Sequence, residues 1–134
     1  MGCVLCGVVK EEFRLVKEGK YSFCVVCLEP LKKGHLMVLP KRHVTNLSDL
    51  DSKEAKDLLD LVFEIKEILF KKYKHHPILH MNFGEHSTQE HIHFHLVPSK
   101  GNLRDSMGSF ENLRKRKKGS QMYLKKIRDY ILEE

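Results

Sequence analysis

The sequence has no long hydrophobic run, no internal repeat and no low-complexity linker. A membrane-spanning helix needs roughly 18 or more consecutive apolar residues, so we expect no integral membrane segment. The apolar stretch over residues 2–9 is short and runs into Lys10-Glu11-Glu12, which is not the pattern of a secretory signal peptide. These absences together predict a cytoplasmic protein.

What the sequence does contain is typical of one globular domain. It has 134 residues, of which 41% are hydrophobic and 31% charged, a balance that suits a single core. Residues 1–99 carry 14 Lys and Arg against 13 Asp and Glu, whereas residues 100–134 carry ten against five. We therefore expect a domain over residues 1–99 and a basic extension over residues 100–134 that packs on it or trails from it.

The extension contains a run of five basic residues, Arg114 to Lys118. Such a run is able to attract nucleic acid, but a solvated loop is its commoner role. Aromatic residues that would stack on bases are not interleaved with it. Nucleic-acid binding through this run is therefore kept open but not favoured.

Hydrophobic patterning predicts two strands near the N-terminus. Residues 21–28 are rich in aromatic and small apolar residues, and residues 35–39 form a second apolar run that Pro40 closes. Pro30 and Gly34 mark a turn between them. Strands this close in sequence are most simply antiparallel neighbours.

A long helix is expected to follow. Asp51 and Glu54 have the spacing of a capping box, and an apolar stripe at helical spacing comes next, formed by Leu58, Val62, Ile65 and Leu69. Residues 78–83 and 90–97 are further strand candidates, and residues 122–132 suit a last helix. This order predicts an α+β domain with an antiparallel sheet, one long helix and a C-terminal helix.

Three of the nine histidines alternate within five residues, at His91, His93 and His95. On a strand, alternate side chains share one face, so the three imidazoles are expected to lie in a row above a buried apolar face. Three interpretations compete. The segment is a surface strand rich in histidine by chance, a three-histidine zinc site, or a phosphate site in which one imidazole is the nucleophile.

The segment resembles the signature of the histidine triad family of nucleotide hydrolases and transferases, in which histidine alternates with apolar residues over His91–Val97. A second block, residues 34–43, is similar to the family's strand Gly-His-x-Leu-Val-x-Pro-Lys-x-His. The expected long helix sits between the blocks, as it does in the family. The resemblance covers roughly residues 3–98 and implies the family's fold.

The resemblance implies a mechanism and partners. The middle histidine, His93, is expected to attack the α-phosphorus of a nucleotide and form a nucleotidyl-histidine that water hydrolyses. His95 is expected to bind the phosphate, with His35 as its polar partner. A purine nucleotide, most often one that contains adenine, is the implied substrate, and a homodimer is the implied assembly.

Two departures from the family concern substrate binding. Where the family usually has Asp or Asn for the ribose hydroxyls, this chain has Cys27, a weak donor and acceptor. The loop before the triad, which starts at Asn82, is about two residues short, and His86-Ser87 replaces the usual Gly-Gln. Phosphate contacts are expected from Ser87 and Thr88, and Asn82 is expected to be a further substrate-binding residue.

The four cysteines of a cytoplasmic protein suggest a metal site or core thiols, not disulfides. Their C-x2-C-x17-C-x2-C spacing suits a four-cysteine zinc site. However, Cys24 and Cys27 are three apart on an expected strand and face opposite sides, so they are not expected to share a metal ion, and a core thiol is the preferred interpretation for Cys24. The resemblance implies a different structural zinc site, because some family members bind zinc through the residues that correspond here to Cys3, Cys6, His43 and His91.

The sequence thus predicts a hydrolase or nucleotidyl transferase that cleaves a phosphoanhydride or phosphoramidate bond at the α-phosphate. Dinucleoside polyphosphates and nucleoside phosphoramidates are the candidate substrates. Two alternatives stay open. One is a nucleotide-binding module with little turnover, suggested by Cys27 and the altered loop, and the other is a three-histidine metal-binding protein or enzyme.

Overall fold

The computed structural model describes residues 3–84, 87, 89–104 and 118–133. Within these residues the chain forms five strands, two α-helices and two short 3-10 helices. In chain order the elements are η1 (Val8–Lys10), β1 (Leu15–Glu18), β2 (Ser22–Val26), β3 (Leu36–Pro40), η2 (Leu47–Asp49), α1 (Ser52–Tyr73), β4 (Pro77–His80), β5 (Phe94–Pro98) and α3 (Gln121–Leu132).

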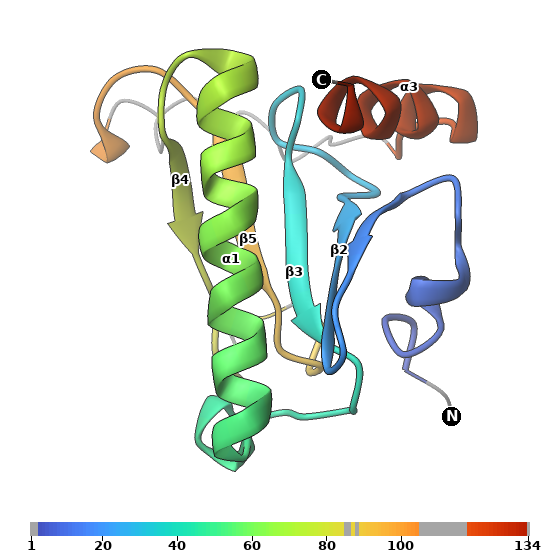
Figure 1. Cartoon of the computed structure of the whole chain (residues 1–134), viewed down its shortest axis with the longest axis vertical. Coiled ribbons are helices and arrows are strands. Elements are labelled where there is room, and N and C mark those ends of the chain that lie inside the picture. The colour runs from blue at the N-terminus through green and yellow to red at the C-terminus, as the bar shows by residue number, and fades with distance from the viewer. Residues whose placement is uncertain (1–2, 85–86, 88, 105–117, 134) are drawn as a thin grey trace.

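The strands form one antiparallel sheet in the order β1-β2-β3-β5-β4, which leaves β1 and β4 at its edges. The expected pairing of β2 with β3 is confirmed over five residue pairs, from Ser22↔Pro40 to Val26↔Leu36. Figure 1 shows α1 running across the sheet, with β4 and β5 beside it. The predicted α+β architecture is confirmed.

Helix α1 begins at the predicted capping box. The Asp51 carboxylate accepts from the Glu54 amide at 2.8 Å, and the Glu54 carboxylate accepts from the Asp51 amide at 3.1 Å. These bonds satisfy amides that the first turn of a helix leaves without partners. The helix ends at Tyr73 and is capped by Lys74, whose φ of 65° is left-handed, and Pro77 follows.

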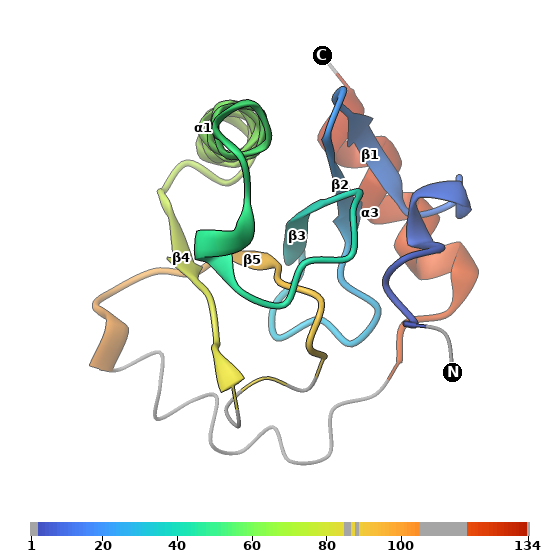
Figure 2. The same cartoon turned by 90° about the horizontal axis from the view of Figure 1, so that it is seen from below.

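Alternation along the strands divides the core into two layers. Cys24 and Val26 face a core that includes the α1 stripe, whereas Phe23 and Val25 face the other side of the sheet. The first core also receives three α3 side chains, those of Leu124, Ile127 and Ile131. The second core is covered by Leu5 and Val8 from the N-terminal segment, and Figure 2 shows this segment beside β1 and β2.

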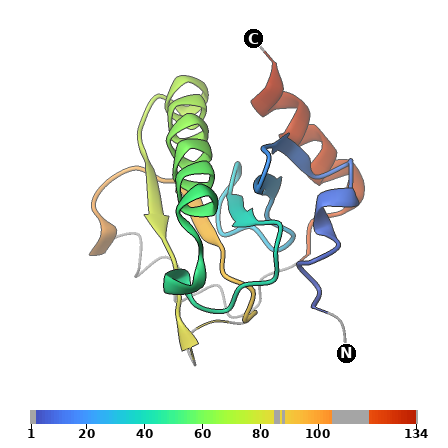
Figure 3. The same cartoon turned by 60° about the horizontal axis from the view of Figure 1, so that its bottom comes forward.

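Several predicted bounds need correction. Strand β4 ends at His80 and not at residue 83, and β1 was not expected at all. The larger error concerns the histidine strand, because β5 begins only at Phe94, so His91 and His93 precede it. The last helix was predicted well, starting at Gln121 against an expected 122, and Figure 3 shows it beside β1.

Other sequence-based expectations lie partly outside the described residues. The division of the chain near residue 99 stays a prediction, and residues 114–117 of the basic run are not among those described. Over the described part of the chain, no helix combines the length and the apolar character needed to cross a membrane.

Candidate functional site

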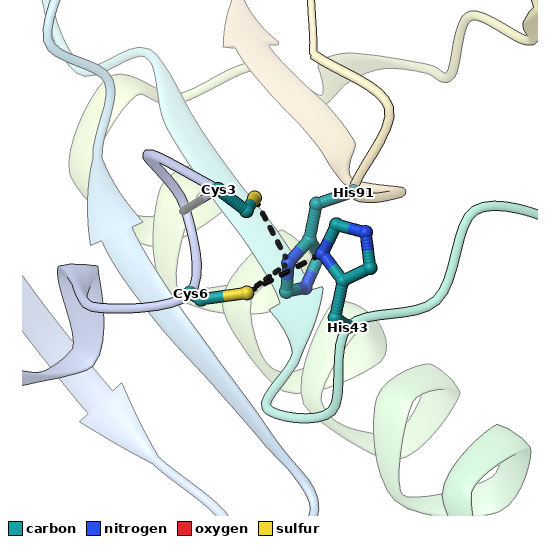
Figure 4. Close-up of side chains that lie close together, drawn as sticks. All are labelled: Cys3, Cys6, His43 and His91. Carbon is teal, nitrogen blue, oxygen red and sulfur yellow. Dashed lines mark hydrogen bonds between the residues drawn. The ribbon is translucent and has the colours of Figure 1, made fainter. Parts of the chain in front are cut away.

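Two cysteines and two histidines from three distant segments converge at the N-terminal end of the chain. Cys3 and Cys6 lie on the turn before η1, His43 lies just after β3, and His91 lies before β5 (Figure 4). The Cys6 Sγ is 3.3 Å from His43 Nδ1 and 3.5 Å from His91 Nδ1, while Cys3 Sγ is 3.7 Å from His91 Nδ1. One ligand atom from each residue lies within 4.8 Å of all the others.

The hydrogen bonds of His91 suit a metal ligand. Its Nε2 is 2.7 Å from the Pro40 carbonyl oxygen, which can only accept, so Nε2 carries the proton. Its Nδ1 is then a lone pair that faces both thiols. Burial lowers the pKa of His91, which favours the neutral imidazole that metals bind. A carbonyl that holds the remote nitrogen of a ligand is the usual outer support of a zinc site. The four residues therefore fit a metal ion.

A second group with metal-ligand atoms comprises Cys27, His35 and His95. The Leu31 amide donates to His35 Nδ1 at 3.0 Å, so that nitrogen is unprotonated. His35 Nε2 then carries the proton and donates to His95 Nδ1, 2.8 Å away. A neutral His35 that bound a metal through Nε2 would need a proton on Nδ1, opposite the Leu31 N–H. The hydrogen bonds of this group therefore place the proton of His95 on its Nε2. The same arrangement of protons does not suit a metal ion.

His93 is oriented by the backbone of its neighbour. Its Nδ1 is 2.8 Å from the His91 carbonyl oxygen, so Nδ1 carries the proton and Nε2 presents a lone pair. Burial lowers the pKa of His93, and the neutral ring is the nucleophilic form. The ring lies edge-on to that of His95, with centroids 4.7 Å apart. The pair offers a nucleophilic nitrogen beside an oriented N–H donor.

The three signature histidines do not share one centre. His91 belongs to the cysteine cluster and His95 to the Cys27 group, and no metal-ligand group among the described residues contains two of the three. The expectation of three imidazoles in one row rested on a strand over 90–97, and that strand starts at Phe94. The three-histidine metal hypothesis therefore gains no support from the geometry.

His80 is a histidine of this region that the sequence analysis did not select. It lies on β4 directly opposite His95, and the two rings stack with centroids 4.6 Å apart and planes 16° from parallel. His35 contacts His95 from another direction, with centroids 5.0 Å apart. Residues directly opposite each other on paired strands share one face of the sheet. The register of β4 against β5 was therefore needed to place His80 beside His95, and the sequence alone does not give that register.

The expected phosphate contacts lie on the loop between β4 and β5. Asn82 and Ser87 line a pocket of about 220 Å³, and among the described residues no histidine lines it. The Ser87 hydroxyl donates to the Gln89 carbonyl and accepts from the Gln89 amide. Thr88 lies outside the described residues. Asn82 and Ser87 therefore lie together on this loop, which precedes the segment with the three signature histidines. The described lining of their pocket does not include the rings of those histidines.

Cys24 and Cys27 lie on opposite faces of the sheet, as expected. Cys24 is fully buried in the core beneath α1, and burial raises the pKa of its thiol. Cys27 follows β2, is 4% exposed, and packs in the core on the other side of the sheet. A four-cysteine zinc site is thereby excluded for these side chains, and Cys24 is a core thiol.

Comparison with known proteins gives a family match. The HIT domain family model matches residues 10–102. The adenosine 5'-monophosphoramidase of Schizosaccharomyces pombe is 30% identical over 101 residues, which cover 73% of this chain and 74% of that protein. The AP-4-A phosphorylase of Mycobacterium tuberculosis is 34% identical over 95 residues, which cover 68% of this chain and 49% of that protein. The chain therefore spans about half the length of that phosphorylase.

Solved structures share the fold. A Hit-like protein of Bartonella henselae, described as involved in cell-cycle regulation, superposes with a TM-score of 0.78 at 18% identity, covering 98% of this chain and 95% of that one. A Zn-bound histidine triad family protein of Mycobacterium smegmatis superposes with a TM-score of 0.70 at 22% identity, covering 98% and 94%. At these identities the likeness concerns the fold alone.

Proposed function

This chain belongs to the HIT domain family, and from that premise we propose that it hydrolyses a nucleotide conjugate at the α-phosphate through a nucleotidyl-histidine. The observation that carries the proposal is the hydrogen bond from His93 Nδ1 to the His91 carbonyl, 2.8 Å long. This bond leaves His93 Nε2 as a lone pair, and the adjacent His95 ring supplies an N–H donor. A fixed nucleophile beside a fixed donor suits attack on a phosphoanhydride or a phosphoramidate.

The reaction has two displacements at phosphorus. In the first, His93 Nε2 forms a bond to the α-phosphorus, the bond from phosphorus to the leaving group breaks with its electron pair, and an amide leaving group takes a proton from solvent to depart as the amine. In the second, water forms a bond to the same phosphorus, the P–N bond breaks with its electron pair returning to His93 Nε2, and the proton of the water passes to solvent. His95 Nε2–H donates a hydrogen bond to a phosphate oxygen in both steps. This bond stabilises the negative charge that develops on that oxygen in each transition state.

The nucleotide is proposed to be purine-based, with adenine favoured, because the relatives include an adenosine 5'-monophosphoramidase and an AP-4-A phosphorylase. Asn82, Ser87 and Thr88 are proposed to contact the phosphate. Cys27, as the residue at the ribose position, offers only weak hydrogen bonds. We therefore expect the ribose hydroxyls to add little to substrate affinity.

The decisive experiment compares the wild type with His93→Asn on two substrates, adenosine 5'-phosphoramidate and diadenosine tetraphosphate. We expect AMP release from at least one of them by the wild type, and a loss of at least roughly 10³-fold in the variant, which is usual for a removed nucleophile. AMP affinity should persist in the variant. His75→Asn, which lies beyond the end of α1, is the matched control and should keep full turnover.

The same experiment separates the alternative. Nucleotide binding without turnover of either substrate would replace the proposal by a nucleotide-binding module. Equal turnover by the wild type and His93→Asn would reject His93 as the nucleophile. Which of the two substrates is preferred then names the leaving group.

We further propose that the metal held by the cysteine cluster is a structural zinc ion. Two thiolates and two imidazoles are a donor set that zinc favours in tetrahedral sites, and their ligand atoms lie within 4.8 Å of one another. Metal analysis of the purified protein is expected to give about one zinc per chain. Cys6→Ser should lose it, whereas Cys24→Ser, which changes a buried core thiol, should keep it.

A homodimer is the proposed assembly. Three apolar side chains of α1 at helical spacing, Leu59, Phe63 and Phe70, are exposed, and Leu79 on the edge strand β4 is 47% exposed. Exposed apolar groups on an edge strand and on the helix that packs beside it suit an interface. Sedimentation is expected to show a dimer for the wild type and a monomer for Phe63→Glu, with Lys71→Glu, an exposed residue on another face of the same helix, as the control. A monomeric wild type would refute the assembly.

A further inference from the structure

The proposed nucleophile lies outside the hydrogen-bonded sheet. The pairing of β3 with β5 runs from Leu36↔Leu96 to Val38↔Phe94, and β5 itself begins at Phe94. His93 is the residue before that point. Neither neighbouring strand therefore fixes its backbone, and its orientation must come from other contacts.

Those contacts join two segments: residues 91–93, the pre-β5 segment, and residues 40–44, which comprise the last residue of β3 and the loop after it and are called here the β3 exit loop. His91 Nε2 donates to the Pro40 carbonyl at 2.7 Å, and the Ile92 amide donates to the Val44 carbonyl at 2.8 Å. His91 is fully buried and Ile92 is 3% exposed. Two hydrogen bonds thus hold the pre-β5 segment against the β3 exit loop, one donated by a side chain and one donated by the backbone.

The β3 exit loop is itself anchored to α1. Arg42 in this loop forms a two-pronged ion pair with Glu54, with Nε and Nη2 at 2.9 and 2.8 Å from the two carboxylate oxygens. The same Nη2 donates to the Asp49 carbonyl at 2.9 Å. A planar guanidinium held in this way fixes direction as well as distance. The conformation of the β3 exit loop is therefore fixed by these bonds. What can vary is how tightly the pre-β5 segment is held against the loop.

The cysteine cluster spans the same junction. His43 comes from the β3 exit loop, His91 comes from the pre-β5 segment, and Cys3 and Cys6 come from the N-terminal turn (Figure 4). Thiol contacts of 3.3–3.7 Å to imidazole nitrogens are weak hydrogen bonds. A bound zinc ion would replace them by bonds of about 2.0–2.3 Å. Metal binding would therefore tie the two segments together at the residue whose carbonyl orients His93.

We propose that metal in this cluster is a positioning centre for the nucleophile, acting through the backbone of His91. The metal fixes the His91 ring, the ring fixes the residue, and the His91 carbonyl then holds His93 Nδ1–H, so that Nε2 faces the phosphate. Cys3 and Cys6 are in this sense remote positioning residues for the reaction. The inference rests on the proposed role of His93, but its structural part is testable without turnover.

The competing explanation is that the metal only stabilises the fold. In that case metal loss lowers the free energy of unfolding but leaves the pre-β5 segment and the activity of each folded molecule unchanged. The two explanations predict different consequences of metal loss. A positioning centre affects residues 91–93 and kcat, whereas a purely stabilising ion affects the fraction of folded protein.

The test uses the full chain, as wild type with and without chelator and as Cys6→Ser. Three quantities are measured: hydrogen exchange of the Ile92 amide, the ¹⁵N signals that report which His93 ring nitrogen carries the proton, and kcat separately from KM. Val4→Ala, between the two cysteines, controls for change in the turn. Leu124→Ala, in the core under α3, controls for a general loss of stability.

Metal removal is expected to speed exchange of the Ile92 amide about tenfold or more while the β2–β3 amides stay protected. The His93 ring should then show both tautomers, and kcat should fall by about 10–100-fold, as when a supporting contact is lost, with KM within about twofold. Zinc addition to the chelated wild type should reverse all three changes. Both control variants should keep the wild-type Ile92 exchange relative to the β2–β3 amides and the wild-type His93 signals.

An unchanged Ile92 exchange rate and a single His93 tautomer after metal removal would overturn the inference, even if the protein became less stable. If Cys6→Ser fails to fold, the chelated wild type at low temperature gives the same readouts. If the protein turns over neither substrate, the exchange and ¹⁵N measurements still decide the coupling, so failure of the proposed function is distinguishable from failure of this inference.

Discussion

His35 Nε2 lies 2.8 Å from His95 Nδ1, and the direction of this hydrogen bond is fixed from the backbone. The Leu31 amide donates to the other nitrogen of His35 at 3.0 Å. The proton of His35 is thereby placed toward His95, and the proton of His95 is placed on its far nitrogen. A backbone amide in the turn before β3 thus determines which nitrogen of His95, the ring proposed to bind the phosphate, is a donor.

Replacement of His35 tests this chain of bonds. His35→Leu removes the donor to His95, so both tautomers of His95 become available, and we expect kcat to fall by about 10–100-fold, as for other supporting contacts. Steady-state kinetics and ¹⁵N signals of His95 measure the effect. His35→Gln, which retains an N–H donor, should recover part of the loss. A His35→Leu enzyme with wild-type kcat would contradict the assignment.

His80 is predicted to hold the plane of the His95 ring. The two rings stack at 4.6 Å, so His80→Ala should let His95 rotate, lowering kcat by roughly three- to tenfold with little change in KM, a smaller effect than loss of a hydrogen-bonded support. His80→Phe retains a flat ring and should restore most of the rate. If His80→Phe is as slow as His80→Ala, the nitrogen atoms of His80 matter and stacking alone does not explain its role.

Tyr73 and Gly34 form a close contact that supports the turn before His35. A Cβ on Gly34 would lie 2.5 Å from the Tyr73 oxygen, and Gly34 has a φ of 87°. The Tyr73 hydroxyl is buried without a hydrogen-bond partner among the described residues, and burial raises its pKa to about 12. Tyr73→Phe should therefore leave stability unchanged or raise it by up to about 1 kcal/mol.

Gly34→Ala should do the opposite. The substitution combines a left-handed backbone with a clash against the Tyr73 ring, so we expect a loss of about 2 kcal/mol or more in the free energy of unfolding. Urea denaturation measures both variants. Gly101→Ala also has a positive φ, of 85°, but nothing within 4 Å of its Cβ, so it separates the backbone contribution from the clash.

Local signals were enough to predict much of the fold. The capping box at Asp51 and the apolar stripe of α1 depend only on spacing within one helix, and both are present. The β2–β3 pair depends on a short turn with proline and glycine, and it too is present. The resemblance to the family supplied the ligand set that the structure brings together at Cys3, Cys6, His43 and His91.

What the sequence could not show depends on contacts between distant segments. Alternation of His91, His93 and His95 suggested one continuous strand, but the Ile92 amide pairs with Val44 and not with β3. That bond directs the chain away from the ladder before Phe94. The position of His80 depends on the β4–β5 register, and β1, only four residues long, has a pattern too short to be recognised.

The ion pair that anchors the β3 exit loop predicts an acid-dependent loss of stability. Arg42 holds the pKa of the buried Glu54 carboxyl at about 2, against an unfolded value near 4.3. Because the folded carboxyl binds a proton less readily, its contribution is complete above about pH 4.5 and disappears as the pH falls toward 2. At pH 7, Glu54→Gln should lower the free energy of unfolding by about 1–3 kcal/mol, since it weakens both the Arg42 pair and the α1 cap.

Urea denaturation of the wild type and Glu54→Gln at several pH values from 7 to 2.5 measures this contribution as a difference between matched proteins. The difference should shrink steadily below pH 4.5, because Glu54 of the unfolded chain binds a proton near pH 4.3 whereas the folded carboxylate binds one only as the pH approaches 2, so that protonation favours unfolding. Glu67→Gln, which removes an exposed carboxylate of the same helix paired with Lys66, should change stability by less than about 0.5 kcal/mol at pH 7. A Glu54→Gln difference that stayed constant down to pH 2.5 would mean that the charge of Glu54 contributes nothing, and that the anchor of the β3 exit loop is the neutral hydrogen bonding of the cap.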